Sequence, residues 1–416
     1  MATITPEAAE LTALISSIKQ KDPGMGVKKV LAEIQAQQPT WLVSEKRVKK
    51  MMGEAGIAMA RPEAEMDLDP SVPISHIDTD VDVSALTNGQ VKARMINKVI
   101  GKGLFAAQDL PKGKIIFTEF PFIYFPPMKR YNMVVKGEAC GLCARTIKNG
   151  HLLVCECPSC GGRIKYCTKA CRQTSWDSSH RFECSGLNPA LKEYINYCVA
   201  ENWNAGMGAL RCYERILIAN ETSPQELASV LKHFDAFATV SQEERQRKET
   251  SWDMMGDQCR EIWEKALELL IKGCQYPLKV TGKNGVSVLT KPLPDHLKDS
   301  LFSMDTYLKI VGRYNINNQD GGLYLLHSSL NHACVPNAII DHPGAGTNYG
   351  VSVRLARDIK RDEQLQITYC DPRWKRETRQ QYLRTEYLFT CKCKRCTGSD
   401  DNLSDEMMQA LGFGQQ

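Results

Sequence analysis

The chain begins with a helical pattern of apolar residues. Leu, Ile and Val recur at i, i+3, i+4 and i+7 over residues 11–18 and again over residues 27–34, a spacing typical of amphipathic helices. A third short segment begins near Ser44 and carries the basic run of residues 46–50. These segments predict a small helical module at residues 1–52.

After this module the apolar residues first show no period and later alternate with polar residues. Residues 53–90 are rich in Pro and acidic residues without a period, so we predict a linker. Strand-like alternation begins at Val91 and returns near residues 114–119, 351–355 and 365–369. The two groups of strands are about 200 residues apart. This predicts a mixed α+β fold whose β-rich part has accepted an insertion.

Much of the insertion is predicted to be helical. Ser223 can cap a helix that starts at Pro224, a residue type suited to the first turn, and the pattern continues to Phe234. A second helical stretch covers residues 262–271. We therefore expect a helical insert at residues 185–300.

Composition and charge exclude several classes of protein. The 416 residues contain 53 Lys+Arg and 48 Asp+Glu, a formal net charge of +5, and a chain of this length can bury a core without disulfides. No apolar run approaches the roughly 18 residues of a membrane span, and the first ten residues lack the pattern of a signal peptide. We expect a protein of the nucleus and/or cytoplasm that is neither secreted nor membrane-bound. The charge is too mild to indicate a nucleic-acid binder by itself.

Cysteine is the informative residue type. Of seventeen cysteines, eight fall between Cys140 and Cys184 and five between Cys334 and Cys396. In a reducing compartment such clusters indicate metal ligands, whereas isolated cysteines indicate core packing. The four scattered cysteines are therefore expected to bind no metal: Cys198, Cys212, Cys259 and Cys274.

The first cluster has the ligand spacing of two zinc sites. Its pairs are separated by two or three residues, which lets one turn aim two ligands at a single ion. The eight predicted ligands are Cys140, Cys143, Cys157, Cys160, Cys167, Cys171, His180 and Cys184. Cys155 is a ninth candidate that we leave spare, because Cys157 forms the closer pair with Cys160.

The second cluster needs a partner from elsewhere in the chain. Cys391, Cys393 and Cys396 supply three ligands, and tetrahedral zinc takes four. Cys334 lies 57 residues before Cys391 in the distinctive segment Asn-His-Ala-Cys-Val-Pro-Asn, residues 331–337, and is the predicted fourth ligand.

The first cluster resembles the MYND zinc finger in its ligand order and in the surroundings of Tyr166, Trp176 and His180. The resemblance implies interleaved sites. One ion would take Cys140, Cys143, Cys167 and Cys171, and the other would take Cys157, Cys160, His180 and Cys184. MYND fingers mostly bind peptides, so a Pro-rich peptide partner is implied. The alternative is a finger that only braces the fold, because two ions could each supply folding energy of order 10 kcal/mol.

The remaining motifs resemble the SET domain of protein-lysine methyltransferases and its post-SET zinc site. They are KVIGKGLFAAQDLPKGKIIF (98–117), SLNHACVPN (329–337), EQLQITYCD (363–371) and YLFTCKCKRC (387–396). With a MYND finger between the halves, the chain resembles the SMYD family, in particular its shorter fungal branch. About twenty polar residues follow Cys396 where longer members carry a helical repeat domain, so we expect a more open substrate cleft.

This resemblance implies a domain organisation and site residues. Residues 91–130 and 301–375 would form the two SET parts, residues 140–184 the finger, and residues 376–416 the post-SET zinc region and tail. Tyr369 would be the catalytic tyrosine and would also contact the cofactor, S-adenosyl-L-methionine. The other implied cofactor-binding residues are Gly101, Lys102, Gly103, Asn331, His332 and Phe389. Three Zn²⁺ ions per chain are implied.

The implied activity is histone-lysine N-methylation, with the H4 tail as the expected substrate. A ribosomal or other basic protein would suit the same chemistry equally well. A rival function is a non-enzymatic adaptor whose finger recruits a partner protein. The basic run of residues 46–50 allows a helix-turn-helix-like module that binds nucleic acid, although a solvated charged face is the simpler interpretation. We expect a monomer.

Overall fold

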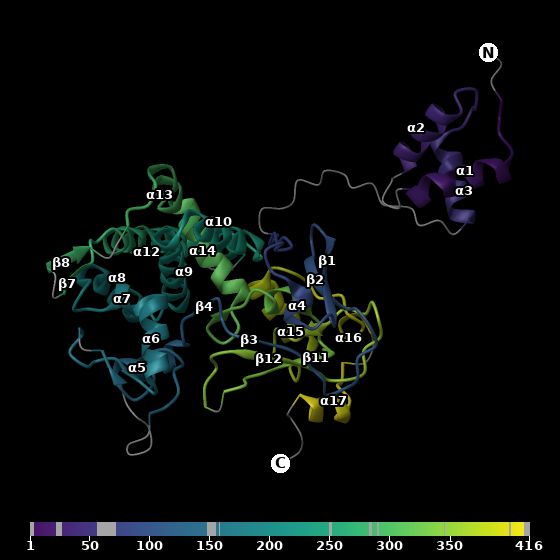
Figure 1. Cartoon of the computed structure of the whole chain (residues 1–416). Helices are drawn as coiled ribbons and strands as arrows, with labels where there is room; N and C mark the ends of the chain where they lie inside the picture. Colours follow the sequence, from purple (N-terminus) through teal and green to yellow (C-terminus); the bar gives the residue numbers. More distant parts are fainter. Residues whose placement is uncertain are drawn as a thin grey trace. The chain divides into compact units, whose positions relative to one another are not determined.

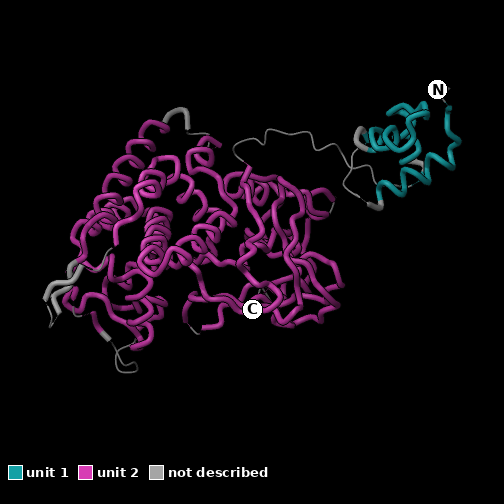
Figure 2. Tube along the Cα trace, turned by 45° about the horizontal axis from the view of Figure 1, so that its top comes forward, with its two compact units in different colours: residues 1–69 teal, residues 70–416 magenta. Residues whose placement is uncertain are grey.

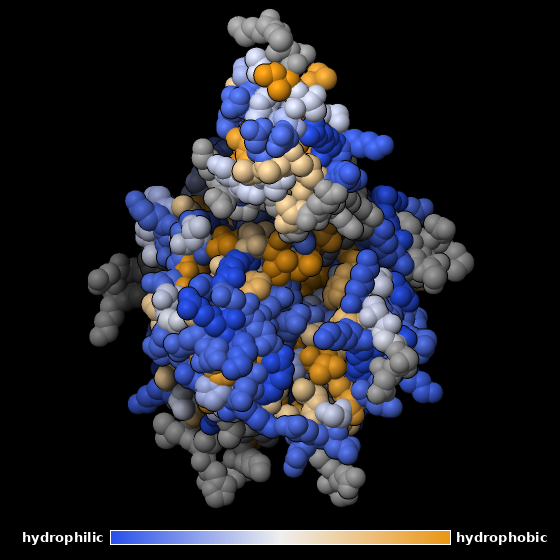
Figure 3. All heavy atoms as spheres, turned by 90° about the vertical axis from the view of Figure 1, so that its right-hand side faces the viewer, coloured by the Kyte–Doolittle hydropathy of each residue, from blue (hydrophilic) through white to orange (hydrophobic). Residues whose placement is uncertain are grey.

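The computed structural model divides into two compact units, residues 1–69 and residues 70–416 (Figure 2). The ranges that the structure describes are 4–21, 27–55, 72–147, 155–157, 159–248, 252–282, 285–288, 291–344, 346–398 and 401–411. No helix in these ranges is long and apolar enough to cross a membrane. On the face drawn in Figure 3, hydrophilic side chains cover most of the surface and apolar side chains show in separate patches.

The first unit contains the three predicted helices. They are α1 (Ala8–Lys21), α2 (Val27–Gln37) and α3 (Glu45–Glu54). Leu11, Ile15, Val30 and Val48 are among the residues that are fully buried between them. The i, i+3, i+4 spacing thus places the apolar positions on facing sides of the helices, and this unit has a core of its own.

The β-rich part of the second unit is built from both ends of the insertion. Its N-terminal strands are β1 (Val91–Asn97), β2 (Gly101–Ala106), β3 (Ile115–Glu119) and β4 (Ile123–Tyr124). Its C-terminal strands are β9 (Gly322–Leu323), β10 (Asn331–His332), β11 (Ala338–Asp341), β12 (Val351–Leu355) and β13 (Gln366–Ile367). The short 3-10 helix η2 (His327–Ser329) precedes β10.

Strand pairing joins the two groups. β3 lies antiparallel to β12, with Val351 opposite Glu119, and β4 lies antiparallel to β9. β10 and β13 pair in parallel, with His332 opposite Ile367. One hydrophobic core holds residues of both groups, including the fully buried Leu104 and Leu355. The predicted α+β fold with an insertion between its halves is therefore present.

The insertion is helical over most of its length. Its helices are α8 (Pro189–Ala200), α9 (Asn204–Thr222), α10 (Pro224–Ala236), α11 (Gln242–Gln246), α12 (Trp252–Cys274) and α13 (Asp295–Leu301), with a hairpin of β7 (Lys279–Gly282) and β8 (Gly285–Val288) before α13. They are followed by α14 (Met304–Asn317). Figure 1 shows these helices beside the strands. The predicted start at Pro224 is confirmed, with the Ser223 hydroxyl accepting from the Glu226 N–H at 3.0 Å.

The cysteine-rich segment forms small elements next to the helical insert. They are α5 (Met128–Val135), β5 (Cys155–Glu156), β6 (Lys165–Tyr166), α6 (Lys169–Ser175), the π-helix η1 (Trp176–His180) and α7 (Arg181–Glu183). The chain ends with α15 (Arg376–Tyr387), α16 (Lys394–Thr397) and α17 (Asp405–Ala410).

Two segments differ from the sequence pattern. Within the predicted linker, residues 56–71 lie outside the described residues, but Ile74 exchanges backbone hydrogen bonds with Thr239 at 3.0 and 2.8 Å, and α4 (Val83–Leu86) precedes β1. The strand expected over residues 365–369 ends at Ile367. The reason is local, because the Tyr369 N–H donates to the His332 ring at 3.0 Å instead of to a neighbouring strand.

Candidate functional site

The Gly101-Lys102-Gly103 turn and the Asn331-His332 segment meet where the two halves join. The Asn331 side-chain amide donates to the Lys102 carbonyl at 2.8 Å. Gly101 has a φ of +78°, a conformation that favours glycine. A Cβ on Gly103 would lie 2.7 Å from Gln364 and 3.2 Å from the Asn331 amide nitrogen. Backbone conformation therefore favours glycine at position 101, and a side chain at position 103 would require neighbouring side chains to shift.

The Lys102 side chain turns away from this turn into the protein. Its Nζ donates to the Ala236 carbonyl at 2.8 Å and lies 5.7 Å from the centroid of the Phe237 ring. Burial lowers the pKa of Lys102 to about 8, an effect that the nearby Asp78 and Glu119 carboxylates oppose. The resemblance implied that Lys102 binds the cofactor, and the structure adds that its side chain joins β2 to the helical insert.

Glu119 is a half-buried residue that the sequence reasoning missed. Its two carboxylate oxygens accept from the backbone N–H groups of Leu326 and His327, each at 3.0 Å, at the start of η2. Burial raises the pKa of this carboxyl, while these hydrogen bonds oppose the rise. Glu119 thereby fixes the turn that leads into Asn331 and His332. A single Glu at the end of a strand gives no sequence signal for such a role.

His332, Tyr369 and Phe389 come together although 57 residues separate the first from the last. The His332 Nδ1 accepts from the Tyr369 N–H at 3.0 Å, and the His332 ring centroid lies 5.4 Å from that of Tyr369 and 5.9 Å from that of Phe389. The Tyr369 hydroxyl donates to the Leu330 carbonyl at 2.6 Å. Burial raises the pKa of Tyr369, so its hydroxyl stays protonated at neutral pH.

Tyr369 lines a cavity of about 260 Å³ whose other walls were not predicted. Its aromatic wall includes Trp374, Tyr382 and Tyr387, and the Tyr387 ring centroid lies 4.6 Å from that of Tyr369. The polar side includes Asn318, Gln319 and Asp371. The aromatic residues that follow Tyr369 in the sequence were the available signal, but without a period they did not indicate a shared wall.

His327 also lines the cavity. The residue is 6% exposed, and neither ring nitrogen has a hydrogen-bond partner among the described residues. Its ring centroid lies 5.7 Å from that of Tyr324. Burial lowers the pKa of His327 to about 4, so the ring is neutral at physiological pH.

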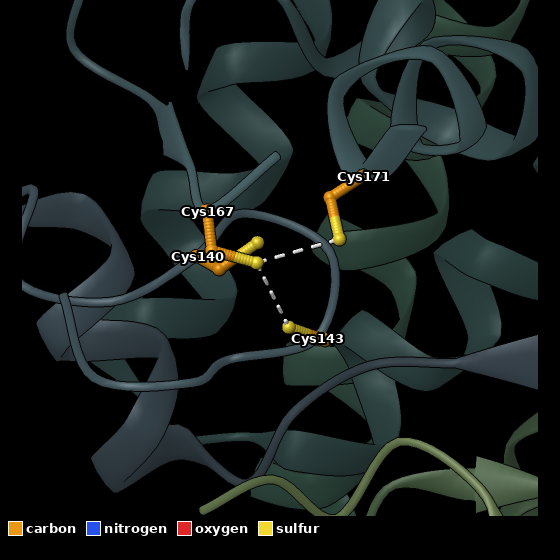
Figure 4. A group of neighbouring side chains, drawn as sticks. All are labelled: Cys140, Cys143, Cys167 and Cys171. Atoms are coloured by element: carbon orange, nitrogen blue, oxygen red, sulfur yellow. Dashed lines mark hydrogen bonds between the residues drawn. The ribbon is translucent and has the colours of Figure 1, made fainter. Parts of the chain in front are cut away.

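The cysteine-rich segment gathers its eight predicted ligands into the two interleaved groups that the resemblance implied. In the first, Cys167 Sγ lies 3.7 Å from Cys143 Sγ and 3.5 Å from Cys171 Sγ (Figure 4). The Thr168 hydroxyl accepts from the Cys171 N–H at 3.0 Å, which caps α6 and sets Cys171 facing Cys167. Cys140 completes this group.

The second group of this segment is equally compact. Cys160 Sγ lies 3.9 Å from His180 Nε2, and Cys157 Sγ lies 4.0 Å from Cys184 Sγ. His180 ends η1 and is 5% exposed. The Thr347 hydroxyl donates to the Cys143 carbonyl, which joins this segment to the C-terminal strands.

Cys334 meets Cys391, Cys393 and Cys396 in a third group. Its Sγ lies 3.4 Å from Cys396 Sγ and 3.8 Å from Cys391 Sγ. α15 supports the loop, because the Gln380 side chain bonds both the N–H and the carbonyl of Cys391. Leu388, with a φ of +61°, reverses the chain after α15.

The three groups have the donors and dimensions that tetrahedral zinc requires. Within each, the four ligand atoms lie within 4.8 Å of one another, and at least three members are buried. Four sulfurs at about 2.3 Å from one ion would lie about 3.8 Å apart, close to the separations found here. Four soft donors without an open position are typical of structural rather than catalytic zinc.

Comparison with known proteins gives the family. The model of the SET domain matches residues 101–370. The chain belongs to the SET-domain family. This chain has a mixed α/β fold in which strands from before and after the insertion pair with each other, as described above.

Within this family the chain is similar to fungal proteins named histone-lysine N-methyltransferase SET5. That of Yarrowia lipolytica is 28% identical over 95% of this chain and 83% of its own length. That of Mycosarcoma maydis is 30% identical over 79% of this chain and 71% of its own, and that of Candida albicans is 27% identical over 99% and 85%. A crystal structure of the SET domain of LSMT bound to lysine and AdoHcy covers 73% of this chain and 53% of its own, with 13% identity and a TM-score of 0.34.

Proposed function

We propose that this chain transfers methyl groups from S-adenosyl-L-methionine to lysine side chains of histone tails, with H4 as the expected substrate. It is an enzyme of the protein-lysine methyltransferase class, to which its SET domain and its SET5 relatives belong. The observation that supports the chemistry is the position of the Tyr369 hydroxyl beside the aromatic cavity at the junction of the two halves. The names of the relatives support a nuclear location and a histone substrate.

The cavity would first remove water from the lysine amine of the substrate. A lysine ammonium with a pKa of about 10.4 costs about 4.6 kcal/mol to deprotonate at pH 7. The aromatic wall of Trp374, Tyr382 and Tyr387 can pack against the aliphatic stem of the lysine and exclude water, which disfavours the charged form of the amine. Asp371 also lines the cavity, and its carboxylate is paired with the Arg373 guanidinium, whose Nε donates at 2.9 Å.

Orientation of the amine is the second task. The protonated Tyr369 hydroxyl donates to the Leu330 carbonyl, so its oxygen and that carbonyl can both accept from a lysine N–H and aim the nitrogen lone pair. When bound, S-adenosyl-L-methionine supplies an electrophilic methyl on a sulfonium. Gly101, Lys102, Gly103, Asn331, His332 and Phe389 are the residues that we propose to hold it.

We further propose three structural zinc ions and a SMYD-type organisation. Residues 140–184 would be a MYND finger inserted between SET parts at 91–130 and 301–375, with the helical module at 1–52, the linker at 53–90, the helical insert at 185–300, and the post-SET region and tail at 376–416. The interleaved order of the two finger groups supports the MYND proposal. A Pro-rich peptide is the proposed ligand of the finger.

The test uses labelled S-adenosyl-L-methionine with core histones and ribosomal proteins at equal mass, followed by mass spectrometry of modified peptides. We expect label on histone lysines with the parent protein and loss of the label with Tyr369→Phe. Label confined to ribosomal proteins would remove the histone proposal but keep the lysine chemistry. No label in either mixture, with cofactor bound, would favour the adaptor function.

A further inference from the structure

A buried arginine contacts the cluster of Cys334, Cys391, Cys393 and Cys396. Arg379, on α15, is 0% exposed. Its guanidinium cannot be deprotonated in proteins, and an unpaired buried charge costs several kcal/mol. The partners of Arg379 therefore indicate what this region is built to hold.

Those partners include two of the four sulfurs. The Arg379 Nε donates to Cys334 Sγ at 3.4 Å, and Nη2 donates to Cys396 Sγ at 3.7 Å. Nη2 also donates to the Asp401 carboxylate at 2.7 Å, and Nη1 donates to the Trp374 carbonyl at 2.6 Å. The planar fork of a guanidinium reaches all four acceptors, which the single point of a lysine ammonium does not.

The charges around this cluster favour thiolates over neutral thiols. Arg395, 7% exposed, is a second buried cation here; its Nε donates to the Asp401 carbonyl at 2.7 Å and lies 3.5 Å from the Asp401 carboxylate. Two arginines thus share one carboxylate among the described contacts. With neutral thiols, two arginines and one carboxylate would leave a surplus of one positive charge, whereas four thiolates with Zn²⁺ carry a net charge of minus two, which more than offsets that surplus.

The same arginine is connected to the methyl-transfer site. Cys334 Sγ lies 3.2 Å from His332 Nε2, and His332 Nδ1 accepts from the Tyr369 N–H. Arg379 also donates to the carbonyl of Trp374, and Trp374 lines the cavity. Loss of Arg379 would therefore loosen Cys334, whose sulfur contacts His332, and Trp374, which lines the cavity.

We propose that Arg379 is the counter-charge of the metal centre at Cys334, Cys391, Cys393 and Cys396, and a positioning residue for His332 and the cavity wall. The inference rests on the proposed function, because it requires a metal at this cluster. Arg379 does not touch the reacting atoms, so its effect is on metal retention and cofactor affinity first.

The experiment compares full-length parent, Arg379→Met, Arg379→Lys and Asp401→Asn. Arg384→Met, which alters an exposed arginine of the same helix, is the matched control. Zinc per chain is measured before and during a chelator challenge, and Cys391→Ser defines the loss of this one ion. Cobalt-substituted protein gives the sulfur-to-metal charge-transfer band, and calorimetry gives the affinity for S-adenosyl-L-methionine.

We expect Arg379→Met to weaken zinc at this one site by about 10-fold to 100-fold, the range for residues that support metal ligands. Its charge-transfer band should move to lower energy because the N–H···S bonds that stabilise the thiolates are lost. Arg379→Lys should fall between parent and Arg379→Met, and Arg384→Met should match the parent. Asp401→Asn should release zinc faster than the parent. If Arg379→Met does not fold, the results for Asp401→Asn and Arg379→Lys decide the test.

Either of two distinguishable results would overturn the inference. Parent-like zinc release and an unchanged band in the Arg379 variants would reject the role of Arg379 and leave the metal proposal intact. A parent protein with no zinc at this cluster, equal to Cys391→Ser, would reject the metal proposal and the inference with it.

Discussion

Tyr369 shows how a residue at the end of a strand becomes a candidate catalytic group. β13 stops at Ile367, and the bend that follows turns the Tyr369 ring toward the cavity while its N–H bonds to His332. The ring packs against the core that holds Leu365 and Ile367, and it also lines the cavity. Tyr369 therefore lies between the core of the strands and the wall of the cavity.

We predict that Tyr369→Phe lowers the rate of methyl transfer by about 10² to 10⁴-fold, while most of the cofactor affinity and the fold are retained. The ring still packs against Tyr387, but the hydroxyl that orients the amine is gone, and contacts of this kind are worth about 3 to 5 kcal/mol. Single-turnover transfer and calorimetric cofactor binding check this in parallel. Equal rates for variant and parent would make Tyr369 a packing residue.

His327 predicts a pH dependence of stability. Its pKa is lowered to about 4 in the fold, whereas an unfolded histidine titrates near 6.5. The unfolded chain thus takes up a proton first as the pH falls, so stability is full above pH 6.5 and is lost toward pH 4. Asp320 and His342 are the titratable neighbours that act on this ring, and Glu119 bonds its backbone.

The test is the free energy of unfolding in urea at pH 7.5 and 5.5. His327→Leu should lose about 1 to 2 kcal/mol less than the parent between these values, because the variant has no proton to take up at this position. His296→Leu, at an exposed histidine, should behave as the parent. Parallel losses in His327→Leu and the parent would show that His327 does not titrate as expected.

At the scale of elements, the C-terminal loop and β10 act as one unit. Cys334 follows β10 directly after Ala333, and it shares its cluster with three cysteines that α15 holds in place through Gln380. Phe389 lies between α15 and Cys391 and packs against His332. The proposed cofactor site and the proposed metal site therefore have residues of the same two segments.

We predict that Cys334→Ser loses one zinc and also weakens binding of S-adenosyl-L-methionine. Without the metal, the loop that carries Phe389 is no longer drawn toward His332. Cys370→Ser is the control, because Cys370 is buried nearby but belongs to none of the three groups. Undiminished cofactor affinity in a Cys334→Ser protein that has lost this zinc would disprove the coupling.

At the scale of the whole molecule, the three groups of proposed metal ligands each bring together residues that are apart in the sequence. Two groups close the cysteine-rich segment on itself, and the third joins residues 57 positions apart. By contrast Cys198, Cys212 and Cys274 are buried among apolar residues of the helical insert. Cysteines in such surroundings pack as small hydrophobic residues.

We predict three zinc ions per chain by elemental analysis of the purified protein. A variant with Cys198, Cys212, Cys259 and Cys274 replaced by Ala should keep all three, since these residues take part in none of the metal groups. Two or fewer ions in the parent at full occupancy would remove one assignment. Loss of an ion in the fourfold variant would show a ligand among the scattered cysteines.

The sequence by itself determined the features that depend on neighbours along the chain. Helical spacing predicted α1 to α3, Pro224 predicted the start of α10, and the short gaps between cysteines predicted clusters of metal ligands, whose division into groups was implied by the family resemblance. The motifs around Gly101, Asn331 and Tyr369 carried the resemblance that named the candidate site residues. These signals are readable because periodicity and ligand spacing are local properties.

Only the tertiary structure decided the contacts between distant segments. The pairing of β3 with β12, the aromatic wall of the cavity and the hydrogen bonds of Arg379 all join residues that no local pattern relates. The same holds for the buried ring of His327, whose nitrogens have no hydrogen-bond partner within the described part of the chain. Glu119 and Lys102 are likewise single charged residues whose burial depends on the elements that cover them. Their roles follow from packing, because burial and partner choice are set by the whole fold.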